Sequence, residues 1–149
     1  MADTNSIRNI AVCGHGGTGK TSLVEEILFN AGVISKAETV ESGRTVSDFT
    51  EEEIEKGMSI HSSLSHFDWK GTKINLFDTP GASDFIGEGV ASFRAAESAV
   101  VLVGARSSLQ IETVKLWRRL NARDMPRVVF VNKMEKERAD FFKVLEDLS

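Results

Sequence analysis

Apolar and polar residues alternate along this chain in a way that predicts strands and helices in turn. The runs 100–103 and 128–131 are continuously apolar, which is typical of strands buried on both faces of a parallel sheet. Residues 137–148 instead repeat apolar side chains every three or four positions, the spacing of an amphipathic helix. These patterns predict strands at 8–13, 60–68, 73–77, 99–103 and 127–131 and helices at 20–31, 85–96, 109–122 and 137–148.

This order of elements predicts a three-layer α/β/α fold. Strands that alternate with helices form mostly parallel sheets, because each helix crosses back over the sheet before the next strand. Residues 69–72 include Gly71 and separate two strand-like runs, which favours a hairpin. We therefore expect a mostly parallel sheet with one antiparallel edge strand.

The pattern predicts no regular element over the long stretch 33–59. This stretch is polar, and Glu51, Glu52 and Glu53 follow one another within it. A loop of this length is usually functional or disordered. The glutamates are typical of a solvated loop, and the whole segment would suit a mobile switch that becomes ordered around a γ-phosphate and Mg²⁺.

A glycine-rich motif joins the first predicted strand to the first predicted helix. Residues 14–21 fit the pattern G-x-x-x-x-G-K-[ST]. In this context, glycines let backbone N–H groups approach phosphate oxygens, and the helix N-terminus adds positive charge. Lys20 would reach the β- and γ-phosphates and the Thr21 hydroxyl would bind Mg²⁺; the alternative is a glycine-rich turn with a chance Lys-Thr pair. The nucleotide-binding residues predicted here are His15, Gly16, Gly17, Thr18, Gly19, Lys20, Thr21 and Ser22.

A carboxylate follows the predicted strand 73–77, in the sequence Asp78-Thr79-Pro80-Gly81. A carboxylate at the end of a strand beside a phosphate loop can hold Mg²⁺, usually through water. The Gly81 N–H is then free to bond a γ-phosphate oxygen. An ordinary Pro-Gly turn would explain the same residues, although it would not explain their pairing with a phosphate-binding motif.

A third motif, Asn132-Lys133-Met134-Glu135, follows the predicted strand 127–131. Ligands of open α/β sheets bind at the carboxyl ends of the strands. There the Asn132 amide would hydrogen-bond the edge of a base, and the Lys133 stem would cover its face. The Glu135 carboxylate would accept the N1–H and N2–H of guanine together. The alternative is a polar strand-to-helix loop.

Together, and in this order, the three motifs resemble the GTP-binding domain of translational GTPases, most closely elongation factor G and its paralogues. Residues 55–60 are similar to the family's first switch, E-[RK]-G-I-T-I. The resemblance implies a GTPase-type P-loop NTPase fold, GTP or GDP and Mg²⁺ as ligands, and the ribosome as a partner of the full-length parent. It also implies that Lys20 and Gly81 act in catalysis, and that Thr21, Ser59 and Asp78 bind the metal.

Four residues depart from the family pattern. Gly17 stands where elongation factor G has an acidic residue, and Ser59 stands where the first switch has a Mg²⁺-binding threonine. Ala82 replaces the histidine that positions the hydrolytic water, which an alanine cannot do. Glu135 replaces the aspartate that reads guanine, and its extra methylene displaces the carboxylate. We therefore expect slow hydrolysis in isolation and a weakened preference for guanine.

Composition narrows the function further. With 18 basic and 22 acidic residues the formal net charge is −4, which argues against a general or sequence-specific nucleic-acid binder. The single cysteine, Cys13, excludes an internal disulfide and a cysteine-based zinc site. The first six residues do not resemble a signal peptide, and no apolar run is long enough to cross a membrane. These features predict a cytoplasmic protein without membrane attachment, and we expect it to be a monomer.

The expected unit is a single GTP-binding domain over residues 1–149. Because the family has a further strand, a guanine-contacting loop and further domains, the resemblance implies a C-terminally truncated fragment of a multidomain protein. Its function would be Mg²⁺-dependent GTP binding in a translation factor, with hydrolysis coupled to a ribosome-associated step of protein biosynthesis. Two alternatives stay open. One is a non-catalytic or very slow guanine-nucleotide switch, and the other is a P-loop ATPase or kinase.

Overall fold

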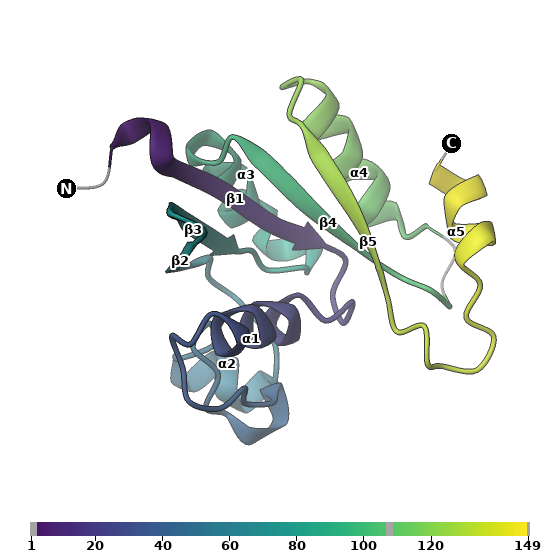
Figure 1. Cartoon of the computed structure of the whole chain (residues 1–149). Coiled ribbons are helices and arrows are strands. Elements are labelled where there is room, and N and C mark those ends of the chain that lie inside the picture. Colours follow the sequence, from purple (N-terminus) through teal and green to yellow (C-terminus); the bar gives the residue numbers. More distant parts are fainter. Residues whose placement is uncertain (1–2, 107–108, 149) are drawn as a thin grey trace.

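The computed structural model describes residues 3–106 and 109–148, and these residues form a five-stranded sheet with helices packed on both faces (Figure 1). Short 3-10 turns lie at Thr4–Ser6, Val40–Ser42 and Ser83–Phe85. The main elements, in chain order, are β1 (Ile7–Gly14), α1 (Lys20–Asn30), α2 (Glu51–Lys56), β2 (Ser63–Trp69), β3 (Thr72–Asp78), α3 (Ile86–Ala95), β4 (Ser98–Gly104), α4 (Ile111–Asn121), β5 (Arg127–Asn132) and α5 (Phe141–Leu148).

The strand order is β2-β3-β1-β4-β5, and only the β2–β3 pair is antiparallel. This confirms the predicted mostly parallel sheet with one antiparallel edge strand. The register brings Val12 of β1 beside Asp78 of β3, and Gly104 of β4 beside Asn132 of β5. The carboxyl ends of the four parallel strands therefore meet at one edge of the sheet, and all three sequence motifs begin there.

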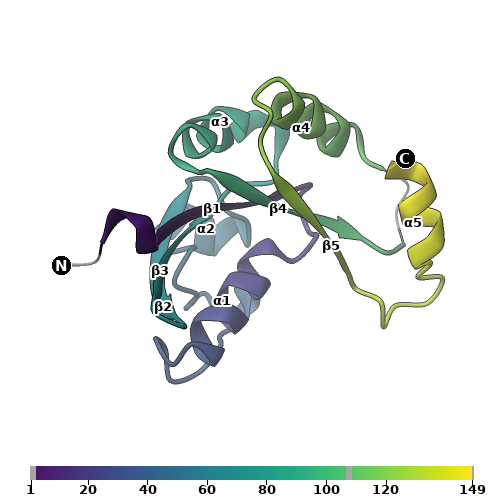
Figure 2. The ribbon, with the colours of Figure 1, turned by 45° about the horizontal axis from the view of Figure 1, so that its top comes forward.

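The two faces of the sheet are covered by different helices, as Figure 2 shows. Along β1, Ala11 and Cys13 face the core under α3 and α4, whereas Val12 faces the core under α1. This alternation follows from the two-residue period of a strand. Leu28 of α1 and Leu102 of β4 also belong to the second core, and both are almost fully buried.

Two predicted boundaries are wrong, and hydrogen bonds explain both. The strand predicted from residue 60 begins at Ser63, because the amides before it donate to the carboxylates of Glu53 and Glu88 rather than to a neighbouring strand. The helix predicted from residue 137 begins at Phe141, because the Asp140 carboxylate accepts the Lys143 N–H and caps its first turn.

A short helix, α2, lies in the stretch 33–59, for which the pattern predicts no element. Thr50 and Glu53 form a capping box at its start, and Gly57 ends it in a left-handed conformation with φ of 60°. The helix has six residues, and Glu53 is its only buried one. A helix without an apolar stripe produces no hydrophobic periodicity, so the pattern could not reveal it.

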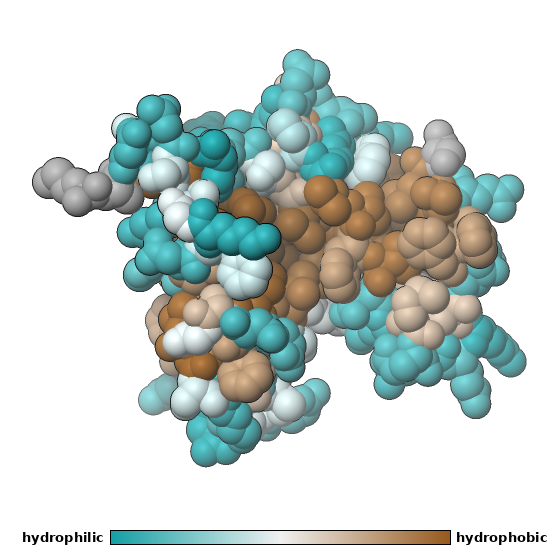
Figure 3. Space-filling model, in the orientation of Figure 1, coloured by the Kyte–Doolittle hydropathy of each residue, from teal (hydrophilic) through white to brown (hydrophobic). Residues whose placement is uncertain are grey.

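One face of β5 is exposed, although its apolar run predicts burial on both faces. Val128 and Phe130 point to the side of the sheet that α1 covers, but α1 lies over β1 and β3 and does not reach them (Figure 1). Figure 3 shows the resulting apolar area over β5 and α5. Its exposed members are Val128, Phe130, Met134, Phe141, Phe142 and Leu145.

Among the described residues, no helix has the length and apolar character needed to span a bilayer.

Candidate functional site

The loop between β1 and α1 has the shape that a phosphate-binding loop requires. Gly19 adopts φ of 94°, and a Cβ there would lie 2.5 Å from the Asn132 Nδ2 atom, so only glycine fits. Helix α1 begins at Lys20, whose side chain is buried and whose Nζ donates to the His15 carbonyl oxygen at 3.1 Å. The loop therefore holds a cation and a helix N-terminus on the same side.

Hydroxyl and carboxylate groups meet beside this lysine. The Thr21 hydroxyl donates to Asp78 Oδ2 at 2.9 Å and lies 3.2 Å from the Ser59 hydroxyl oxygen. Asp78 is 2% exposed, and its other oxygen, Oδ1, has no hydrogen-bond partner. The three predicted metal-binding side chains thus come together from α1, β3 and the segment before β2.

Lys20 and Asp78 are electrostatically linked. Burial raises the pKa of Asp78 to about 6, and the nearby Lys20 ammonium works in the opposite direction. Burial likewise lowers the pKa of Lys20, and the charge of Asp78 opposes that shift. Each group therefore favours the charged form of the other in a poorly solvated place.

Asp48 is a member of the site that sequence reasoning missed. The residue is 4% exposed, and neither of its carboxylate oxygens has a hydrogen-bond partner of good geometry. Burial raises its pKa, and the nearby Ser59 side chain opposes that shift. A lone carboxylate within an acidic, irregular segment carries no periodic signal. Asp48 lines a cavity of about 250 Å³ on one side of the phosphate loop. The other lining residues are Gly16, Gly17, Gly19, Lys20, Thr21, Ser22, Val40, Glu41, Gly57, Met58, Ser59, Gly81, Ala82 and Lys133.

These groups suit a hydrated Mg²⁺ ion. Mg²⁺ prefers oxygen ligands, keeps several waters, and is usually held by one or two carboxylates together with substrate phosphates. Asp48 and Asp78 supply three buried carboxylate oxygens without partners, and Thr21 and Ser59 supply hydroxyls. No cluster of three or more His, Cys, Asp or Glu ligands occurs in the described part of the chain.

Gly81 and Ala82 line the same cavity as Thr21 and Ser59. A Cβ on Gly81 would lie 2.6 Å from the Gly16 backbone nitrogen, so any side chain would collide with the phosphate loop. Ala82 follows it and also lines the cavity. Its methyl group offers no donor or acceptor to a ligand in the cavity.

Asn132 and Lys133 bind the phosphate loop itself. The Asn132 amide donates to the Thr18 carbonyl oxygen at 2.9 Å, and Lys133 Nζ donates to the Gly17 carbonyl oxygen at 2.5 Å. Both therefore connect the end of β5 to the loop. The Glu135 side chain is instead 67% exposed and lies 3.7 Å from the Lys136 ammonium.

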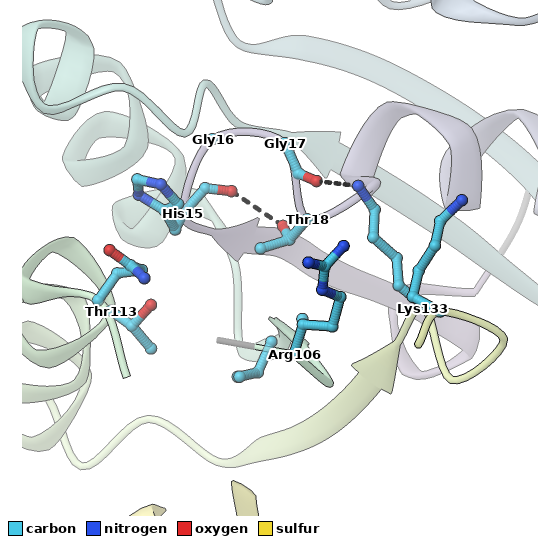
Figure 4. Close-up of a pocket in the computed structure, with 11 residues that line it drawn as sticks. His15, Gly16, Gly17, Thr18, Arg106, Thr113 and Lys133 are labelled. Atoms are coloured by element: carbon cyan, nitrogen blue, oxygen red, sulfur yellow. Dashed lines mark hydrogen bonds between the residues drawn. The ribbon is translucent and has the colours of Figure 1, made fainter. Parts of the chain in front are cut away.

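A second cavity, of about 390 Å³, lies on the α4 side of the phosphate loop (Figure 4). Figure 4 shows the side chains of Arg106 and Lys133 extending toward the loop, and His15 lying toward α4. His15 Nδ1 is 3.2 Å from a carboxylate oxygen of Glu112. Of the residues that line this cavity, the sequence motifs identify His15 and Lys133 but not Arg106, which lies outside every motif.

Known proteins are similar to this chain in sequence. The family described as the elongation factor Tu GTP binding domain matches residues 5–149. The chain is 40% identical over 145 residues to ribosome-releasing factor 2, mitochondrial, of Drosophila willistoni, covering 97% of this chain and 20% of that protein. It is 38% identical over 143 residues to elongation factor G 2 of Borreliella burgdorferi, covering 96% of this chain and 21% of that protein.

Structural comparison agrees with the sequence matches. A crystal structure of a Thermus thermophilus protein superposes with a TM-score of 0.91 at 34% identity, covering 96% of this chain and 22% of that chain. An elongation factor G-like protein of Thermotoga maritima is 38% identical over 148 residues, covering 99% of this chain and 21% of that protein. The chain thus spans about a fifth of the length of the curated relatives that it matches.

Proposed function

The chain belongs to the elongation factor Tu GTP-binding domain family, and we propose that it is the Mg²⁺-dependent GTP-binding domain of an elongation-factor-G-like translation factor. In this proposal, GTP hydrolysis is coupled to a step on the ribosome. The observation that carries it is the meeting of Thr21, Asp78 and Ser59 beside the buried Lys20 at the phosphate loop. Oxygen ligands for a metal and a cation for phosphates lie in one cavity.

Each group of the site has a distinct part in the proposed reaction. Lys20 and the N–H groups of the phosphate loop hold the β- and γ-phosphates and stabilise the charge that develops on them. Thr21 and Ser59 would hold the metal through their hydroxyl oxygens, and the carboxylates of Asp48 and Asp78 would add negative charge beside it. Mg²⁺ held there would neutralise negative charge on the phosphate oxygens. The Gly81 N–H donates to a γ-phosphate oxygen.

A guanine-nucleotide switch with very slow hydrolysis is the second candidate, and Ala82 favours it. Ala82 lines the cavity beside Gly81 and presents only a methyl group there. The attacking water would then lack an orienting side chain from this position. In that case the nucleotide state, rather than turnover, would carry the signal.

Competition between nucleotides tests the proposed function. The protein is loaded with a fluorescent GDP analogue in Mg²⁺, and unlabelled GTP, GDP, ATP and ADP are titrated against it. We expect displacement by the guanine nucleotides at concentrations well below those needed for the adenine nucleotides. Displacement by ATP and GTP at equal concentrations would favour the P-loop ATPase alternative and contradict the proposal.

Replacing Glu135 with aspartate is expected to strengthen the preference for guanine. The shorter carboxylate restores the reach that suits the N1–H and N2–H of guanine, which adenine does not offer, and the pair is worth about 1–3 kcal/mol. Affinities for GDP and ADP are measured for both versions, with Glu137→Asp as the matched control. An unchanged ratio of the two affinities would show that position 135 does not read the base. A longer form of the protein suits this measurement best.

We also propose that the parent protein acts as a cytoplasmic monomer on the ribosome. Its relatives include proteins named as mitochondrial ribosome-releasing factors, so the organelle is a defined alternative. Microscopy of the tagged parent, together with its sedimentation with and without ribosomes, separates these possibilities.

A further inference from the structure

Three glutamates from three different helices hold the backbone of the segment between α1 and β2. Glu25 of α1 accepts the N–H groups of Glu38 and Val46 at 3.1 and 2.5 Å. Glu88 of α3 accepts the N–H of Ser62 at 3.0 Å. Glu53 of α2 makes the largest set of such bonds. Side chains, rather than a strand or a long helix, therefore fix the path of this segment.

Glu53 uses both of its carboxylate oxygens, each in a different direction. Oε2 accepts the N–H and the hydroxyl of Thr50 at 3.1 and 2.8 Å, which closes the cap of α2. Oε1 accepts the N–H groups of Ile60 and His61, both at 3.0 Å. A capping box needs only the Thr50 N–H bond to Oε2 and the Glu53 N–H bond to the Thr50 hydroxyl oxygen. The two bonds to Oε1 are additional, and they tie the helix to the residues that follow Ser59.

The bonds of Glu53 make it a buried anion with a satisfied hydrogen-bonding shell. The side chain is 1% exposed. Burial alone would raise the pKa of Glu53, but the hydrogen bonds that it accepts hold this pKa below its usual range. Glu53 is therefore a carboxylate at neutral pH, and a neutral side chain in its place would lose some of these hydrogen bonds.

The residues that Glu53 ties down flank the metal-binding groups. Ser59 directly precedes Ile60, and its hydroxyl lies 3.2 Å from the Thr21 hydroxyl. Asp48, with its two unpartnered oxygens, lies two residues before Thr50. Glu53 itself does not line the cavity. Its only route to a ligand is through the position of its neighbours.

From this arrangement we infer that Glu53 is a positioning residue that sets the hydroxyl of Ser59 for the metal. The inference rests on the proposed function, because it concerns the metal of that same site. Glutamine at this position offers one oxygen in place of two. The amide NH₂ group of the glutamine must then face either the N–H groups of Ile60 and His61 or the N–H of Thr50. The hydrogen bonds on that side are lost.

A Mg²⁺ titration tests this role. The affinity for a fluorescent GDP analogue is measured from EDTA to saturating Mg²⁺ for the unaltered protein, for Glu53→Gln, and for Glu52→Gln, an exposed neighbour on the same helix. We expect Glu53→Gln to need at least tenfold more Mg²⁺ for half-maximal tightening, with its affinity in EDTA within twofold of the unaltered protein. We expect Glu52→Gln to match the unaltered protein throughout.

A second pair of variants separates positioning from a general loss of structure. If Glu53 acts through Ser59, then adding Glu53→Gln to Ser59→Ala shifts the Mg²⁺ midpoint by less than twofold. A full tenfold shift in that background would overturn the inference. Should Glu53→Gln be unfolded by circular dichroism, Glu53→Asp, which keeps the buried charge and shortens its reach, is held to the same criteria.

The outcomes for the two proposals are distinct. If the unaltered protein binds guanine nucleotide with a clear Mg²⁺ dependence and the Glu53 variant has the same midpoint, only the positioning role is overturned. If the unaltered protein shows no Mg²⁺ dependence, the proposed function is overturned and the positioning role falls with it.

Discussion

Replacing Lys20 with alanine is expected to abolish nucleotide binding and leave the chain folded. Lys20 is buried at the start of α1, and its one direct hydrogen bond to another described residue is to the His15 carbonyl oxygen. Two charge-assisted bonds to phosphate contribute about 3–6 kcal/mol, so the dissociation constant should rise about 10²–10⁴-fold. The fold should persist, because neither apolar core includes the Lys20 side chain.

The measurement is a titration with a fluorescent GDP analogue at saturating Mg²⁺, accompanied by a thermal melt. Lys115→Ala, which removes an exposed cation from α4, is the matched control and should bind as the unaltered protein does. A folded Lys20→Ala protein with the affinity of the control would remove the phosphate-loop assignment. A large loss of thermal stability would instead show that the charge of Lys20 is needed beside Asp78 even without a nucleotide.

The elements that bury continuous or periodic apolar residues could be predicted from the sequence. Strands β1, β4 and β5 and helices α1 and α4 lie within about two residues of their expected ranges. Glycine-rich and strand-terminal motifs likewise place the phosphate loop, Asp78 and Asn132 at one edge of the sheet. The structure brings these groups together as expected. Their roles toward a nucleotide stay predictions.

The polar interior of the site could not be predicted in the same way. Glu25, Glu53 and Asp48 are buried acidic residues, and a sequence pattern assigns such residues to the surface unless their partners are known. Glu25 and Glu53 are bonded to backbone N–H groups of an irregular segment, whereas the Asp48 oxygens have no hydrogen-bond partner of good geometry. Because backbone partners leave no mark on residue identity, only the three-dimensional structure reveals that the charges of Glu25 and Glu53 are satisfied.

A similar limit applies to β5. Its apolar run is typical of a strand buried on both faces, yet Val128 is 66% exposed because no described helix covers it. Strand patterning reports how apolar a segment is, not which element lies over it. The end of β5 nevertheless holds Asn132 and Lys133 against the phosphate loop. The exposure of β5 thus depends on what covers its middle, whereas the residues at its carboxyl end contribute to the geometry of the site.

Placing histidine at position 82 is expected to raise GTP hydrolysis in the full-length parent. Ala82 follows Gly81 at the wall of the cavity that also holds Lys20, Thr21 and Ser59. An imidazole there could orient the attacking water and accept its proton, a contribution typically worth about 10²–10⁴-fold. The unaltered protein should hydrolyse GTP very slowly, because its methyl group can do neither.

Single-turnover hydrolysis of GTP by the unaltered parent, Ala82→His and Ala82→Leu, each with and without ribosomes, decides this point. Leucine adds comparable bulk without a hydrogen-bonding group, so it should leave the rate unchanged, whereas a faster leucine variant would point to packing. If ribosomes accelerate the unaltered protein to the rate of the histidine variant, a ribosomal group replaces the missing side chain, and coupled hydrolysis is supported. Fast hydrolysis by the unaltered protein alone would show that position 82 is not limiting. The slow-switch alternative would then be wrong, and His61, which lies two residues after Ser59, would become the first residue to replace.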